Sequence, residues 1–111
     1  MKYQEVLPIS RQEAEKAFES KDSSQINDAL LRVTYYDSDW SWVQCKCLEF
    51  IKYQDKDVRG LAVTCLGHLA RIHGTLNVDR VVPILESLSD DPEISGKIDD
   101  AIDDIQMFVS Q

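Results

Sequence analysis

The chain contains 111 residues, a length that fits one domain with a single modest core and leaves no room for a second. Its net charge of −8 at pH 7 repels nucleic acid and anionic membrane surfaces. The composition therefore argues against direct nucleic-acid and membrane partners and favours a basic protein partner, unless the surplus acid serves solubility alone.

The first predicted helix begins after a capping box, in which Ser10 and Glu13 stand three residues apart. We expect this helix to end near Lys21, and Ser23 or Ser24 to cap the next one. Both helices place apolar residues at spacings of three and four, which predicts a buried face. These residues are Ala14, Ala17 and Phe18 in the first helix, and Ile26, Ala29, Leu30 and Val33 in the second.

An aromatic turn, residues 35–42, follows the second helix and reads Tyr-Tyr-Asp-Ser-Asp-Trp-Ser-Trp. Within it, Asp39 is expected to cap a third helix that runs to about Tyr53. The predicted inner residues of the third helix are Val43, Cys47, Phe50 and Ile51.

A fourth helix is predicted from the acidic turn at Asp55 to about Ile72, with His73 and Gly74 as its C-terminal stop. Its predicted buried residues are Val58, Leu61, Ala62, Cys65, Leu66 and Leu69. Two interior glycines, Gly60 and Gly67, disfavour a helix energetically, so we expect them to permit close approach by a neighbouring helix.

Two more helices complete the chain. Asn77 can cap the fifth, but Pro83 lies inside its apolar pattern, so that helix either starts later or kinks at the proline. The last helix is predicted over residues 93–109, and no strand pattern competes anywhere. Its predicted buried residues are Ile94, Ile98, Ala101, Ile102, Ile105, Phe108 and Val109.

An internal repeat links the fourth helix to the last one. At an offset of 36 residues, Asp91 matches Asp55, and the following apolar residues and glycines match as well. The matched pairs are Val58 with Ile94, Gly60 with Gly96, Cys65 with Ala101, and Leu66 with Ile102. The second helix shows the same apolar spacing in degenerate form, so the pattern predicts three stacked helix pairs.

The run D-x-D-V-R-x-x-A-x-x-x-L-G-x-L from Asp55 to Leu69 resembles the turn and second helix of a HEAT repeat. The resemblance covers residues 39–109 well and residues 10–35 weakly. It implies an all-α fold, a short right-handed α-solenoid of about three HEAT-like helix pairs in a single domain over residues 1–111. It also implies structural roles for Asp57 and Arg59, which in such proteins link neighbouring repeats.

Two surfaces are candidates for partner binding. In the aromatic turn, Tyr36, Asp37 and Trp40 could contact a basic partner, with Trp40 as the expected exposed aromatic, although one Trp and one Tyr are expected to pack between repeats. In the last helix, four aspartates stand in pairs one turn apart, an arrangement that a basic partner would relieve but that a solvated acidic face also explains. These are Asp99 with Asp103, and Asp100 with Asp104.

Metal, cofactor and catalytic chemistry are not expected. Cys45 and Cys47 point roughly 200° apart on a helix, and Cys65 with His68 would supply only half a zinc site. The three cysteines are expected to be reduced thiols. Neither His68 nor His73 stands at a recognisable spacing from a nucleophile, so we expect that the chain is not an enzyme.

In size, charge and fold the chain resembles the HEAT-like immunity proteins of bacterial contact-dependent inhibition and other polymorphic toxin systems. That resemblance implies a cytoplasmic protein, monomeric before binding, that occludes the active site of a basic, nuclease-type toxin. Two alternatives stay open: a general HEAT-repeat adaptor or scaffold, and a lyase-like enzyme or enzyme subunit. The first residues are charged and contain no apolar run of signal-peptide length, and no segment reaches the ~20 apolar residues of a membrane span.

Overall fold

The computed structural model describes residues 6–109, and this part of the chain contains six α-helices and no strand. The prediction of an all-α fold with six helices is thereby confirmed. The helices are α1 (Arg11–Glu19), α2 (Ser23–Tyr36), α3 (Trp40–Phe50), α4 (Lys56–His73), α5 (Val78–Ser87) and α6 (Ser95–Phe108).

Local side-chain chemistry sets the helix ends. Ser10 caps α1 as predicted, because its hydroxyl accepts the N–H of Glu13. The cap of α2 is Asp22 rather than Ser23 or Ser24, since its carboxylate accepts the N–H groups of Ser24 and Gln25. An ionised carboxylate is a stronger acceptor than a hydroxyl, which explains the difference.

The ends of the later helices also refine the predictions. Helix α3 ends at Phe50, three residues before the predicted end at Tyr53. Gly74 terminates α4 in the left-handed conformation, with φ of 64°, as its place after His73 predicted. Helix α5 begins at Val78, so Pro83 lies inside it rather than in its first turn.

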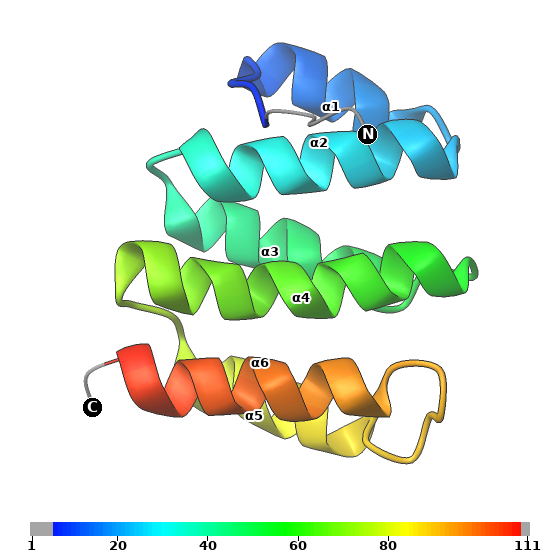
Figure 1. Ribbon diagram of the computed structural model, residues 1–111. Helices are drawn as coiled ribbons and strands as arrows, with labels where there is room; N and C mark the ends of the chain where they lie inside the picture. Colours follow the sequence, from blue (N-terminus) through cyan, green and yellow to red (C-terminus); the bar gives the residue numbers. More distant parts are fainter. Residues whose placement is uncertain (1–5, 110–111) are drawn as a thin grey trace, which may run out of the picture.

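Helices α2, α4 and α6 lie side by side and run in the same direction (Figure 1). Helices α3 and α5 lie behind this layer in the view, and α1 packs against α2. The N-terminal ends of α2, α4 and α6 lie at one edge of the layer and their C-terminal ends at the opposite edge. Helix α4 packs against α2, α3 and α6 and is the centre of the fold.

Most residues predicted to be inward are buried, including every one predicted for the second and third helices. The exceptions are Ala17, Leu61 and Ile102, which are partly exposed, and Phe108, which is 43% exposed. Phe108 remains outside the core because Ile105 and Val109 already occupy the inward positions of the same turn.

Gly67 lies where the backbones of α4 and α6 approach each other. A Cβ atom on Gly67 would lie 3.3 Å from the Cα atom of Ala101, and one on Gly60 would lie 2.9 Å from Cε of Lys97. The predicted role, to admit a neighbouring helix, is confirmed for Gly67, whereas the atoms nearest to Gly60 belong to the flexible end of the Lys97 side chain. Gly96 has no atom within 4 Å of such a Cβ position.

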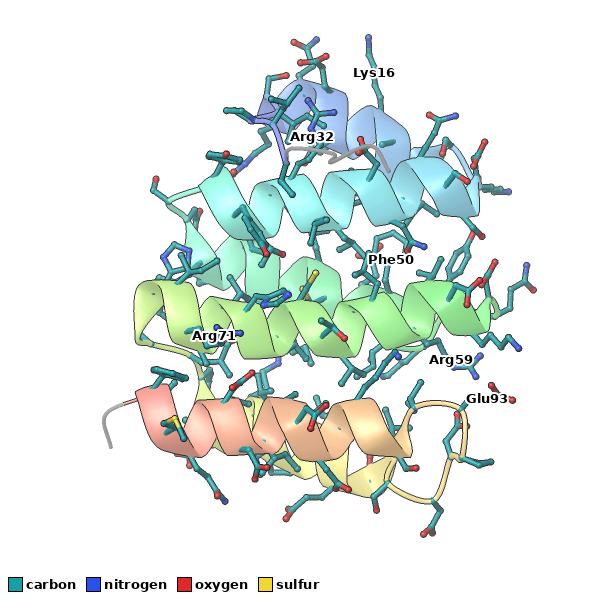
Figure 2. All side chains as sticks on the ribbon, in the orientation of Figure 1. Lys16, Arg32, Phe50, Arg59, Arg71 and Glu93 are labelled. Carbon is teal, nitrogen blue, oxygen red and sulfur yellow. The ribbon has the colours of Figure 1, made fainter. Side chains whose placement is uncertain are left out.

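Hydrogen bonds connect neighbouring helices of the layer, α2 with α4 and α4 with α6, at its N-terminal edge. The hydroxyl of Ser23 donates to Asp55 over 2.7 Å, and Arg59 donates to Asp91 over 3.4 Å. Arg59 also donates to the carbonyl groups of Tyr53 and Gln54, and Figure 2 shows it at this edge between α4 and α6. The bonds from Ser23 and from the N–H of residue 57 hold the pKa of Asp55 below its usual value. The carboxylates in these links are those of Asp55 and Asp91, whereas Asp57, to which the motif assigned a structural role, is exposed.

Candidate functional site

A hollow of about 370 Å³ lies near the C-terminal ends of α2, α4 and α6. It is lined by Tyr35 from α2, by His68, Arg71 and Ile72 from α4, and by Phe108 from α6. We call this cavity, with its five lining residues, the C-terminal hollow. Figure 2 shows Arg71 on α4, directed toward α6. Each of the three helices therefore contributes at least one wall.

The C-terminal hollow gathers apolar side chains that are unusually exposed. Tyr35 is 41% exposed and Ile72 is 46% exposed, and Phe108 completes the set. Met107, next to Phe108, is 74% exposed. The guanidinium of Arg71 lies 6.0 Å from the centroid of the Phe108 ring, at the outer limit of a cation–π contact. Clustered apolar exposure of this kind is typical of binding surfaces, whereas scattered exposure is not.

His68 lies between the aromatic and the charged parts of the hollow. Its ring meets that of Tyr35 edge to face, with centroids 5.6 Å apart. Partial burial, and then the positive charge of Arg71, lower the pKa of His68 below its usual value, while Asp104 acts in the opposite direction. The neutral imidazole is therefore favoured at pH 7, and Arg71 supplies the positive charge of the hollow.

We expect Arg71→Gln to raise the pKa of His68 and Asp104→Asn to lower it, because each change removes one neighbouring charge. The imidazole signals followed by NMR against pH test this, with His68→Gln to assign them. Between the folded pKa and the unfolded value of 6.5, the unfolded chain binds more protons than the folded one. Through His68, the free energy of unfolding therefore rises with pH across that window. A pKa of His68 that falls in Arg71→Gln or rises in Asp104→Asn would contradict these assignments.

One of the four aspartates of α6, Asp104, lies beside the hollow. Asp99, Asp100 and Asp103 are exposed, whereas Asp104 is partly buried, with an oxygen 3.0 Å from the Cβ position of Gly67. Asp104 also acts on His68, so it joins the acidic side of α6 to the C-terminal hollow. Asp100 stands one turn before Asp104 on the same side of the helix. The structure thus brings the acidic candidate surface and the hollow together.

The aromatic turn is divided by contacts within the chain. Arg11 forms an ion pair with Asp37 over 3.1 Å and a longer one with Asp39, and its guanidinium lies 4.0 Å from the ring centroid of Trp42. The side chain of Asp37 is only 17% exposed. Arg11 therefore neutralises much of the charge that was predicted to attract a basic partner.

Trp40 was predicted to be the exposed aromatic residue, and this prediction is wrong. Its side chain is partly buried and packs against the core. The exposed aromatics of the turn are Tyr35 and Tyr36. The hydroxyl of Tyr36 donates to the carbonyl of Val6 over 2.7 Å, which fixes the segment before α1. Tyr35, which was not among the predicted partner contacts, is the residue that lines the hollow.

Ile72 and Phe108 were also missed as site residues, although the sequence contains a signal for them. They stand 36 residues apart, at equivalent places in the internal repeat, in the last turn of α4 and of α6. Apolar residues that recur in this way beside a buried stripe, rather than within it, indicate a shared exposed surface.

A second hollow, of about 450 Å³, is lined by residues of α3 and α5 and of the segment after α3. Its charged residues have both signs, and Arg80 donates to the thiol of the exposed Cys45 over 3.8 Å. The other lining residues are Leu48, Glu49, Lys52 and Ile84. No large apolar side chain of residues 6–109 is strongly exposed here, so this hollow is the weaker candidate.

All three cysteines are free thiols, and Cys47 and Cys65 are buried, where the hydrogen bond with Cys65 and then desolvation raise the pKa of Cys47. Within residues 6–109, no three His, Cys, Asp or Glu side chains come together in a way that could hold a metal ion. None of the six helices combines the length and apolar character needed to cross a membrane, as far as the described residues extend.

The fold and this surface define a six-helix, all-α protein with a clustered apolar and acidic face suited to contact another protein. No protein-family model matches the chain, and no curated protein matches it. A chain in the crystal structure of the CDI complex from Cupriavidus taiwanensis LMG 19424 is similar, with a TM-score of 0.86 and 36% sequence identity. The match covers 97% of this chain and 97% of that chain. The protein therefore belongs to the same family as this chain of a CDI complex.

Proposed function

We propose that this protein is an immunity-type protein, which binds and neutralises the toxin of a contact-dependent inhibition system. The observation that carries the proposal is the full-length similarity to a chain of a CDI complex. Of the two components that such a complex joins, toxin and immunity protein, the immunity component suits this chain. Its net charge is −8, and its exposed apolar residues gather beside an acidic helix.

The proposed toxin is basic and of the nuclease type. A nuclease that holds phosphate groups needs a cationic surface, and the acidic side of α6 is complementary to one. Asp99, Asp100, Asp103 and Asp104 would steer the toxin and pair with its Lys or Arg side chains, and the bound protein would block access to the active site. In this proposal the protein acts in the cytoplasm, by binding rather than by catalysis.

The helices are proposed to form three HEAT-like pairs. Support comes from the 36-residue repeat, from the parallel course of α2, α4 and α6, and from the bonds that connect their N-terminal ends. The bonds from Ser23 to Asp55 and from Arg59 to Asp91 join successive pairs at equivalent places. Arg59 keeps the structural role that the HEAT-like motif implied.

The test uses the full chain and the toxin domain encoded in the neighbouring reading frame. We expect the two purified proteins to form a 1:1 complex in size-exclusion chromatography, and an equimolar amount of this protein to abolish toxin activity. Co-expression is expected to protect cells that produce the toxin. A toxin that remains free and fully active at equimolar ratio would overturn the proposal.

A further inference from the structure

We propose that the C-terminal hollow is a socket for one uncharged apolar or aromatic side chain of the toxin, and that a Lys or Arg beside this side chain pairs with Asp100 and Asp104. This inference rests on the proposed function and specifies which face of the protein makes the central contact. It assigns the walls of the socket to Tyr35, Ile72 and Phe108.

The walls favour an apolar occupant. Tyr35, Ile72 and Phe108 expose between 41% and 46% of their surface, and they come from three different helices. Filling the hollow would remove these three side chains from water at once, and the burial of apolar surface favours association. Interfaces concentrate their binding free energy in such pockets, which hold an anchoring side chain surrounded by weaker contacts.

The lining disfavours an ionised occupant. A cation would be repelled by Arg71, which lines the hollow, and either kind of ion would lose hydration against the apolar walls. Outside the hollow the local charge is negative. Asp100 and Asp104 stand one turn apart on α6, and no basic residue follows Lys97 on that helix. A toxin segment that carries an apolar side chain next to a Lys or Arg would complement both the apolar hollow and the aspartates of α6.

The occupant is a toxin side chain rather than a small molecule or a second copy of this protein. A volume of about 370 Å³ is near the lower end of the roughly 300–1,000 Å³ typical of small-molecule pockets, and this hollow is open to solvent rather than enclosed. A symmetric dimer through the same face would place the aspartates of two α6 helices against each other. Like charges opposed in this way disfavour association.

The experiment measures toxin affinity and rates by surface plasmon resonance for the wild type, Ile72→Ala and Phe108→Ala. Each variant is expected to bind at least tenfold more weakly, mainly through faster dissociation, because a hot-spot contact is lost. Leu7→Ala is the matched control, since Leu7 is 55% exposed and does not line the hollow. Its affinity is expected to equal that of the wild type, and thermal unfolding verifies that each variant is folded.

A second measurement does not depend on substitutions. The imidazole signal of His68 in the wild type is expected to shift when the toxin binds, since the occupant would cover the hollow. Wild type that fails to bind the toxin would overturn the proposed function and the socket together. Tight binding that Ile72→Ala and Phe108→Ala leave unchanged, with an unshifted His68 signal, would overturn the socket alone.

Discussion

Replacing Gly67 by valine is expected to lower the free energy of unfolding by about 1–3 kcal/mol, the usual cost of overpacking a core. Even a Cβ atom at this position would lie 3.3 Å from the backbone of Ala101, and the two further methyl groups of valine have no space on that side. Helix α6 would have to move away from α4, its most extensive packing partner. Urea-induced unfolding followed by circular dichroism measures the change.

Gly96→Val is the matched control for this change. Gly96 occupies the equivalent helix of the internal repeat, and nothing lies within 4 Å of its Cβ position. Its replacement is expected to be neutral or slightly stabilising, because valine has a higher helix propensity than glycine. Equal destabilisation by the two substitutions would show that close helix packing does not explain the presence of Gly67.

The contrast among these glycines explains how far the repeat could predict the fold. Gly60 and Gly96 are equivalent in sequence, yet only Gly60 is near another helix, because within residues 6–109 no helix packs on the far side of α6 from α4 in the way that α6 packs on α4. Likewise Arg59 reaches Asp91, whereas its equivalent, Ser95, has no later turn to contact. A repeat in the sequence predicts the helices and their stacking residues, and the position of each in the chain decides which contacts form.

Every residue that apolar periodicity placed in the buried stripes of α2 and α3 is buried, but the pattern missed Leu48 in α3 and underestimated the burial of α4. Val63 and Ala70 are buried outside the predicted stripe, because α4 has neighbours on three sides. A single stripe describes a helix with one packed face, so it cannot report a helix at the centre of a fold. The pattern also assigned Phe108 to the core. Phe108 is exposed, because Ile105 and Val109 already fill the inward positions of its turn.

The candidate site was predicted in part. The acidic side of α6 could be found from sequence, because residues one turn apart on a helix are neighbours whatever surrounds them. The internal ion pair of the aromatic turn could not be found from sequence. Asp37 and Arg11 are 26 residues apart in the chain, and no local pattern encodes their contact. The C-terminal hollow likewise depends on the packing of three helices that are separate in sequence.

Replacing Asp100 and Asp104 together by asparagine is expected to slow association with the toxin by tenfold or more at low salt, within the roughly 10–10³-fold range of electrostatic steering. For the wild type, the association rate is expected to fall steeply as ionic strength rises from 10 mM to 150 mM, because the screening length shortens from about 30 Å to about 8 Å. The variant is expected to show a weaker dependence on salt. Stopped-flow measurements across this range give both slopes.

Glu15→Gln combined with Glu19→Gln removes the same amount of charge from exposed positions of α1, far from α6 in the fold. We expect this control to keep most of the wild-type rate, since steering depends on charges near the docking face more than on net charge. Equal slowing by the two double variants would contradict a steering role for α6. The thermal stability of the aspartate variant is expected to be unchanged or higher, because Asp100 and Asp104 repel each other one turn apart. A large loss of stability instead would mean that these carboxylates hold the fold together rather than meet a partner.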